Sequence, residues 1–118
     1  MTTQFRCLNT GTPLTVARQK FRRVERIDEY PDTSWLHDDA GRERLDAFRE
    51  GTWHLMGIQA SATVLIPLGG HFVTQTVTSP GLFGIESDSD EEYLDQVFAE
   101  ECVNLAAMLS AIGVTVTE

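Results

Sequence analysis

Carboxylates crowd one stretch of this 118-residue chain, between Gly81 and Leu94. The stretch offers five candidate oxygen ligands for a cation, namely Glu86, Asp88, Asp90, Glu91 and Glu92. A calcium loop of the helix–loop–helix kind needs alternating oxygens, a mid-loop glycine and a glutamate at its twelfth position. Counted from Asp88, the stretch lacks the mid-loop glycine and has Ala99 at position twelve. The sequence therefore predicts no metal site and no cofactor.

The histidines and cysteines do not form a recognisable catalytic motif. His54 has the parity of a core-facing residue at the start of a predicted strand, and no nucleophile pairs with it. Cys7 and Cys102 fit no metal-ligand spacing, so we interpret them as free thiols of a cytoplasmic protein. No glycine-rich phosphate loop is present. These residues indicate no particular reaction and favour a non-enzymatic protein.

Glu101 stands out because it falls within the apolar stripe of a predicted C-terminal helix. At about 100° per residue, its neighbours on that stripe are Val97, Phe98, Leu105 and Met108. A carboxylate on a core-facing stripe must be paired, neutralised or placed at a gap in the core. We predict a buried polar site in which Glu101 pairs with an arginine of residues 22–26, with Arg23 and His54 as its other candidate members. The alternative is a polar pocket between helix and sheet, or an interface.

The elements that would position these residues follow from periodicity. Even positions from Met56 to Ile66 are apolar, whereas odd positions from 57 to 63 are Gly, Gln, Ser and Thr, which predicts a strand with one buried face. Gly69-Gly70 predicts a two-residue hairpin turn into a partner strand over 71–79. That turn sets the facing pairs Leu68 and His71, Ile66 and Val73, Leu65 and Thr74, Thr63 and Thr76, and Ala62 and Val77.

The remaining segments complete an α+β fold. A long helix is predicted over about 90–112, opened by the capping-box pattern Ser89-Asp-Glu-Glu92, and a short helix over about 40–50. A strand is favoured over about 20–28, although the spacing of 16–28 also fits a helix. The sequence thus predicts a single two-layer domain over 1–118, with residues 1–15 as an extended arm. In this domain a small antiparallel sheet, built on the 53–79 hairpin, packs on the long helix.

Charge is distributed unevenly along the chain. All nine Lys and Arg residues lie at or before Arg49, whereas nine of the eighteen acidic residues lie between Gly51 and the last residue, a stretch without any cation. Phosphate contacts need cations, so the second half is a poor nucleic-acid surface. The basic residues from Arg18 to Arg26 could contact nucleic acid, but we favour a basic strand that faces the chain's own acidic helix. No apolar run approaches the ~18 residues of a membrane span.

One segment resembles a known family signature. Phe83-Gly-Ile-Glu-Ser-Asp-Ser-Asp-Glu-Glu-Tyr-Leu94 is similar to a motif of small proteins from phages, plasmids and other mobile bacterial elements. Pro31-Asp-Thr-Ser-Trp-Leu36 resembles a second segment of that family, and residues 53–62 resemble a third. The chain departs from the family at Phe83, where tryptophan is expected, and in a shorter stretch between the second and third segments. The resemblance implies a mobile-element setting and no mechanism.

Two classes of function are compatible with these features. The first is a small acidic protein-interaction module that binds a partner protein with a basic surface, with a role in counter-defence or regulation. Its candidate binding surface consists of Phe83, Glu86, Asp88, Asp90, Glu91 and Asp95. The second is a small-molecule-binding domain or small enzyme with a site around Glu101. A small core with leftover apolar surface further predicts a homodimer.

Overall fold

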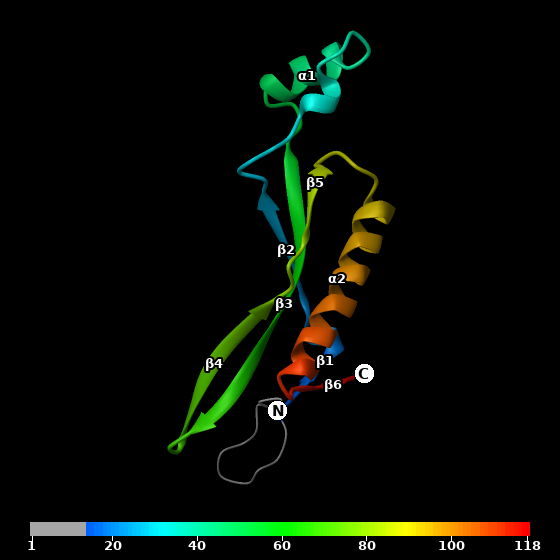
Figure 1. Cartoon of the computed structure of the whole chain (residues 1–118). Coiled ribbons are helices and arrows are strands. Elements are labelled where there is room, and N and C mark those ends of the chain that lie inside the picture. The colour runs from blue at the N-terminus through cyan, green and yellow to red at the C-terminus, as the bar shows by residue number, and fades with distance from the viewer. Residues whose placement is uncertain (1–13) are drawn as a thin grey trace.

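One long strand, β3 (Leu55–Leu68), organises the fold, because β2, β4 and β5 all pair with it. The structure, a computed structural model, describes residues 14–118. The molecule is elongated, 64 Å long and 26 by 25 Å across (Figure 1). The other helices and strands, in chain order, are β1 (Thr15–Ala17), β2 (Arg22–Ile27), α1 (Arg42–Arg49), β4 (His71–Thr78), β5 (Leu82–Glu86), α2 (Glu91–Ala111) and β6 (Thr115–Thr117). Single 3-10 turns occupy Arg18–Lys20 and Ser34–Leu36.

The four-stranded sheet is antiparallel throughout. β2 lies along one edge of β3, and β5 followed by β4 lies along the other edge. The pairing with β2 ends at Ser61, where the pairing with β4 begins. Among the described residues, the rest of β3 therefore has β4 as its one hydrogen-bonded neighbour, and the two strands project as a ribbon (Figure 1).

The β3–β4 hairpin has the register that the sequence predicts. Ile66 faces Val73, and Ala62 faces Val77, so apolar residues of both strands share one face. Gly69 and Gly70 have φ angles of 57° and 83°. Two consecutive positive φ angles define a primed turn, whose twist matches that of the flanking strands and which glycine adopts at little cost. The prediction of this hairpin is confirmed.

The predicted α+β class is also confirmed, with α2 lying along one face of the sheet (Figure 1). β2, α1 and α2 fall within the segments predicted as strand 20–28, helix 40–50 and helix 90–112. The buried apolar residues form three clusters. The first contains Val16, Phe21, Ala60, Ala62, Val64, Leu105, Leu109 and Val114. The second contains Met56, Ile58, Ile85, Leu94 and Val97. The third, at the α1 end, contains Leu36, Leu45, Trp53 and Leu55.

Three features differ from the expectations. β5 is a strand, whereas the pattern of residues 82–85 predicts a short apolar link. α2 begins after Asp90 without a side-chain cap, because the Ser89 hydroxyl donates instead to the Glu86 carbonyl oxygen at 2.6 Å. β1 and β6 form a separate parallel pair, in which Thr15 faces Thr115. The predicted extended arm lies, up to residue 13, outside the described residues.

Candidate functional site

Glu101 is buried between α2 and the sheet, with 5 % of its surface exposed. Its Oε1 accepts hydrogen bonds from the Ser79 hydroxyl at 2.7 Å and from the Gly81 backbone N–H at 2.8 Å. Its Oε2 accepts from Asn104 Nδ2, one helical turn further along α2, at 3.2 Å. A buried carboxylate requires such donors, since burial without them would cost several kcal/mol.

Ser79 links this carboxylate to the sheet at the point where β4 ends. Its backbone N–H donates to the Ala60 carbonyl at 2.8 Å, while its side-chain oxygen accepts from the Ala60 N–H at 2.9 Å. The hydroxyl thus takes the place of a backbone carbonyl in the ladder. Glu101 and Ser79 together fix the Ser79–Gly81 crossing, at which the chain leaves β4 and enters β5.

The predicted partners of Glu101 do not join it. Arg23 lies on β2 and forms ion pairs with Glu25 at 2.8 Å and with Glu91 and Asp95 at 3.1 Å. His54 is exposed and lies just before β3, where its backbone N–H donates to the Ser87 hydroxyl at 2.9 Å. The predicted ion pair between Glu101 and an arginine is therefore wrong, because neutral donors occupy both carboxylate oxygens. The core-facing orientation predicted for His54 is also wrong. The buried even-numbered residues of β3 begin at Met56, whereas His54 precedes the strand and is exposed.

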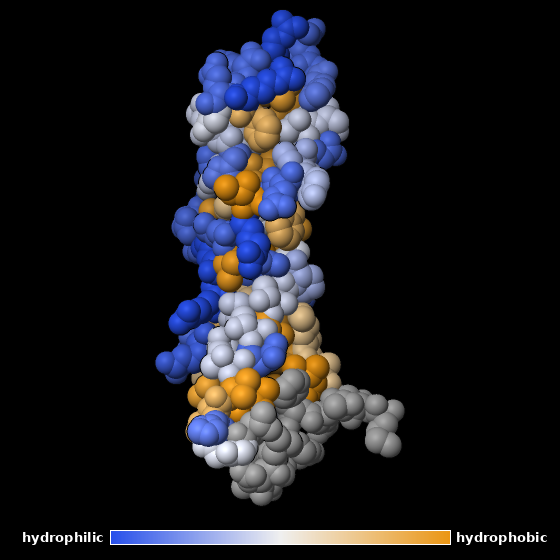
Figure 2. Space-filling view, turned by 90° about the vertical axis from the view of Figure 1, so that its left-hand side faces the viewer, coloured by the Kyte–Doolittle hydropathy of each residue, from blue (hydrophilic) through white to orange (hydrophobic). Residues whose placement is uncertain are grey.

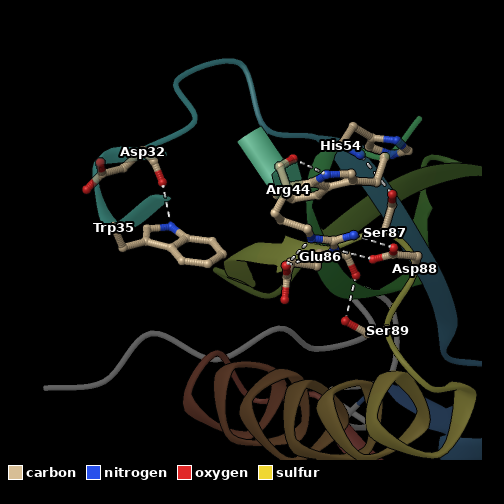
Figure 3. A network of polar contacts seen from close by, with 9 residues as sticks. Asp32, Trp35, Arg44, His54, Glu86, Ser87, Asp88 and Ser89 are labelled. Atoms are coloured by element: carbon tan, nitrogen blue, oxygen red, sulfur yellow. Dashed lines mark hydrogen bonds and ion pairs between the residues drawn. The ribbon is translucent and has the colours of Figure 1, made fainter. Parts of the chain in front are cut away.

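A second polar cluster joins α1 to the end of β5 (Figure 3). Arg44 contacts Glu86 Oε1 at 2.8 Å and binds both carboxylate oxygens of Asp88, at 2.7 and 2.8 Å. Its guanidinium carbon also lies 3.8 Å from the centre of the Trp53 ring. The Trp53 indole N–H donates to the Arg44 carbonyl oxygen at 2.9 Å. One side chain thus joins the third apolar cluster to the acidic loop before α2.

The Arg44 cluster perturbs the protonation of its members. The hydrogen bond from Arg44 holds the pKa of the Asp88 carboxyl below its usual value, against a smaller opposing effect of burial. The same hydrogen bond raises the pKa of the Arg44 guanidinium above its ordinary value. Both shifts favour the charged forms, so this ion pair is stable at neutral pH.

The predicted acidic and aromatic surface is divided by the structure. Glu86 and Asp88 bind Arg44, whereas Glu91 and Asp95 contact Arg23 but remain largely exposed. Asp90 is exposed at the start of α2. These acidic residues therefore belong to two separate groups.

Phe83 lies on the face of the sheet that is turned away from α2. A Cβ added to Gly57 would come within 2.3 Å of the Phe83 ring. Gly57 stands between Met56 and Ile58, whose side chains pack in the second cluster with Leu94 of α2. Side chains alternate along a strand, so the Gly57 position and Phe83 face away from α2. Phe83 instead lines an open hollow of about 650 Å3 beside residues 25–30.

Sequence reasoning missed three members of these clusters, Arg44, Ser79 and Asn104. Arg44 and Ser79 contact acidic residues 42, 44 and 22 positions away, and no local spacing encodes such contacts. Asn104 lies three positions after Glu101 on α2, so helical spacing could have revealed this contact. Within residues 14–118, no group of three His, Cys, Asp or Glu side chains is placed to hold a metal ion. None of the helices in the described part of the chain is long and apolar enough to cross a membrane. Comparison of the chain with protein-family models, curated proteins and solved structures finds no match.

Proposed function

We propose that this chain is a small non-enzymatic protein-interaction module whose acidic α2 face binds a basic surface of another protein. The observation that carries the proposal is the set of exposed carboxylates at the start of α2 and over its solvent side, on a half of the chain that lacks cations. The face comprises Asp90, Glu91, Glu92, Asp95 and Glu100, all of which are exposed. We call these five residues the acidic face.

Internal pairing leaves the acidic face strongly negative. Arg23 is the cation that contacts it within the described residues, and Arg23 is shared with Glu25. Glu92 and Glu100 form no ion pair with any described residue. Such a concentration of one charge sign favours rapid association with a partner of opposite charge and makes binding sensitive to salt.

The resemblance to proteins of mobile elements supports a partner from host defence or regulation. The alternative, a ligand site around Glu101, receives less support. Ser79, Gly81 and Asn104 occupy both carboxylate oxygens, and His54 lies elsewhere. We therefore favour binding over catalysis.

The test compares two neutralised variants of equal charge. Glu92→Gln with Glu100→Gln alters the acidic face, whereas Glu43→Gln with Glu50→Gln removes the same charge from exposed positions around α1. Each immobilised protein is exposed to a bacterial lysate, and retained basic proteins are purified and titrated at low and physiological salt. We expect the α2 variant to bind about tenfold more weakly and the α1 variant to bind as the parent does. Equal loss in both variants, or binding insensitive to salt, would refute the proposal.

A further inference from the structure

The edge of β4 that faces away from β3 has the features of an edge that pairs with a further strand. Residues 71–78 of β4 face residues 68–61 of β3 in an unbroken register, and the opposite edge of β4 has no strand partner among the described residues. Figure 1 shows β4 at the outer margin of the projecting ribbon. An exposed strand edge presents unpaired N–H and C=O groups that readily accept a further strand.

The other sheet edges carry protection that β4 lacks. β2 has the charged residues Arg22, Arg23, Glu25 and Arg26. β5 is five residues long and contains Gly84 with a φ of 79°. Charges, short length and irregular backbone are the usual means by which edge strands avoid association. β4 contains no proline, no bulge and no Lys, Arg, Asp or Glu.

The ribbon is also unusually apolar at its surface. Leu65, Phe72 and Val73 are exposed by 54 %, 69 % and 45 %. Figure 2 shows hydrophobic residues gathered near the hairpin end of the molecule, whereas the α1 end is hydrophilic. Exposed apolar groups of this kind indicate a binding surface.

The sequence of β4 is symmetrical about Gln75. Val73-Thr-Gln-Thr-Val77 reads the same in both directions. In an antiparallel pair of two copies centred on Gln75, each valine faces a valine and each threonine faces a threonine. The valines remain on the face that carries Ile66 and Ala62, and the threonines remain on the other face.

The backbone geometry permits this pairing. The Ser79 N–H donates to Ala60, so odd-numbered residues of β4 direct their backbone groups toward β3 and even-numbered residues direct theirs outward. Centring on Gln75 places Thr74 opposite Thr76 of the second copy, and both have outward groups. Phe72 and Thr78 match in the same way, which gives about eight hydrogen bonds across the axis. Gln75 Nε2 now makes a long contact of 3.4 Å with the outward Thr76 carbonyl, which the second strand would take over.

We propose that two copies of this chain pair through β4, around a two-fold axis at Gln75, to form one continuous antiparallel sheet. The pairing uses a sheet edge and leaves the acidic face of α2 open. A test of the pairing through β4 is therefore independent of a test of the proposed function.

The first test blocks the edge. Thr74→Pro removes an outward N–H and no hydrogen bond to β3, so the monomer keeps its ladder. Sedimentation velocity should show a dimer for the parent chain and at least ~10-fold weaker association for the variant, with an unchanged circular dichroism spectrum. A monomeric parent chain, or a folded variant that dimerises as the parent does, would overturn the proposal.

The second test fixes the register and does not depend on how the proline variant folds. In a background with Cys7→Ser and Cys102→Ser, Gln75→Cys places two thiols at the axis, within disulfide distance. Thr76→Cys is the matched control, because its two copies would lie roughly 8 Å apart. We expect oxidation to link the Gln75→Cys protein into dimers and to leave the Thr76→Cys protein unlinked. Equal linkage in both, or linkage in neither, would contradict this register.

Discussion

Glu101 shows how a single side chain can replace missing backbone hydrogen bonds. The chain breaks its pairing with β3 between β4 and β5, and Glu101 accepts from two donors at that break, Ser79 Oγ–H and Gly81 N–H. Neutral hydrogen-bond donors therefore stabilise the charge of the Glu101 carboxylate. This arrangement explains a carboxylate on an apolar stripe without a ligand or a counter-ion.

We predict that Glu101→Ala lowers the free energy of unfolding by about 3 kcal/mol, because two donors lose their charged acceptor in a buried site. Glu101→Gln keeps one oxygen for these donors and should lose about 1 kcal/mol. Urea denaturation measures both values. The control is Glu100→Ala on the exposed face, which should stay within about 0.5 kcal/mol of the parent. If Glu101→Ala unfolds at the same urea concentration as the parent, these hydrogen bonds do not stabilise the fold.

Asp88 gives the chain an acid-sensitive contact. Its folded-state pKa is lowered by Arg44, so the stabilisation is present above the unfolded value of about 3.9 and is lost as pH falls through the folded-state pKa. We predict that Asp88→Asn lowers the urea midpoint at pH 7 and that the difference from the parent narrows as the pH falls through this range. Asp46→Asn, an exposed change on α1, should show no such dependence. If the difference in urea midpoint between Asp88→Asn and the parent stays constant with pH, the Arg44–Asp88 contact is not the acid-sensitive one.

At the scale of residues, the sequence therefore predicted the buried location of Glu101 correctly and its hydrogen-bond partners wrongly. Helical spacing alone places Glu101 on the buried face of α2, and its burial is confirmed. Two of its three donors, Ser79 and Gly81, come from the β4–β5 crossing, which no periodic pattern describes. The same limit applies to Arg44, whose partners are 42 and 44 positions away.

At the scale of elements, Gly57 and Phe83 form a matched pair across two strands. Phe83 lies where a side chain at position 57 would be, with 2.3 Å from its ring to a Cβ added there. The glycine in the middle of β3 is thus a site of close approach, since its φ angle is not positive.

A double-mutant cycle tests this pair. Gly57→Ala should destabilise the parent by about 1–3 kcal/mol, because the Phe83 ring must move. In a Phe83→Ala background the same change should be neutral or stabilising by about 0.5 kcal/mol, since alanine suits a strand better than glycine does. Thermal or urea unfolding of the four proteins gives the coupling energy. Additive effects would show that the two positions do not interact.

Local sequence predicted the elements whose partners are close in the chain. The β3–β4 hairpin follows from alternation and a glycine pair, both of which act locally. The sequence did not predict β5, because Gly84 interrupts the alternating pattern of this five-residue strand, which forms only through pairing with β3. β1 was missed for the same reason, since it is three residues long and pairs with β6 at the other end of the chain.

At the scale of the whole molecule, the three apolar clusters are arranged along the long axis rather than merged into one core. The α1 cluster contains Leu36, Leu45, Trp53 and Leu55 and is joined to the body partly through Arg44. A separate cluster of this size can open independently of the rest of the protein.

We predict that Leu45→Ala, which should cost about 2–5 kcal/mol locally, uncouples the α1 end. Trp53 is 2 % exposed and reports on this cluster, so its fluorescence should change at lower urea than the far-ultraviolet circular dichroism of the body. Leu105→Ala, in the first cluster, is the comparison, and it should shift both signals together. Coincident transitions in the Leu45→Ala protein would show that the clusters unfold as one unit.

The parallel pair of β1 and β6 also has a consequence for the order of folding. The ion pair between Arg18 and Glu118 joins residues 100 positions apart. Closing so large a loop carries a high entropic cost, whereas the hairpin closes two residues and forms within microseconds. The β3–β4 ribbon should therefore form first, and the pair of β1 and β6 should form last. During synthesis, β4 would accordingly be formed and exposed before the last strand of the fold has been made.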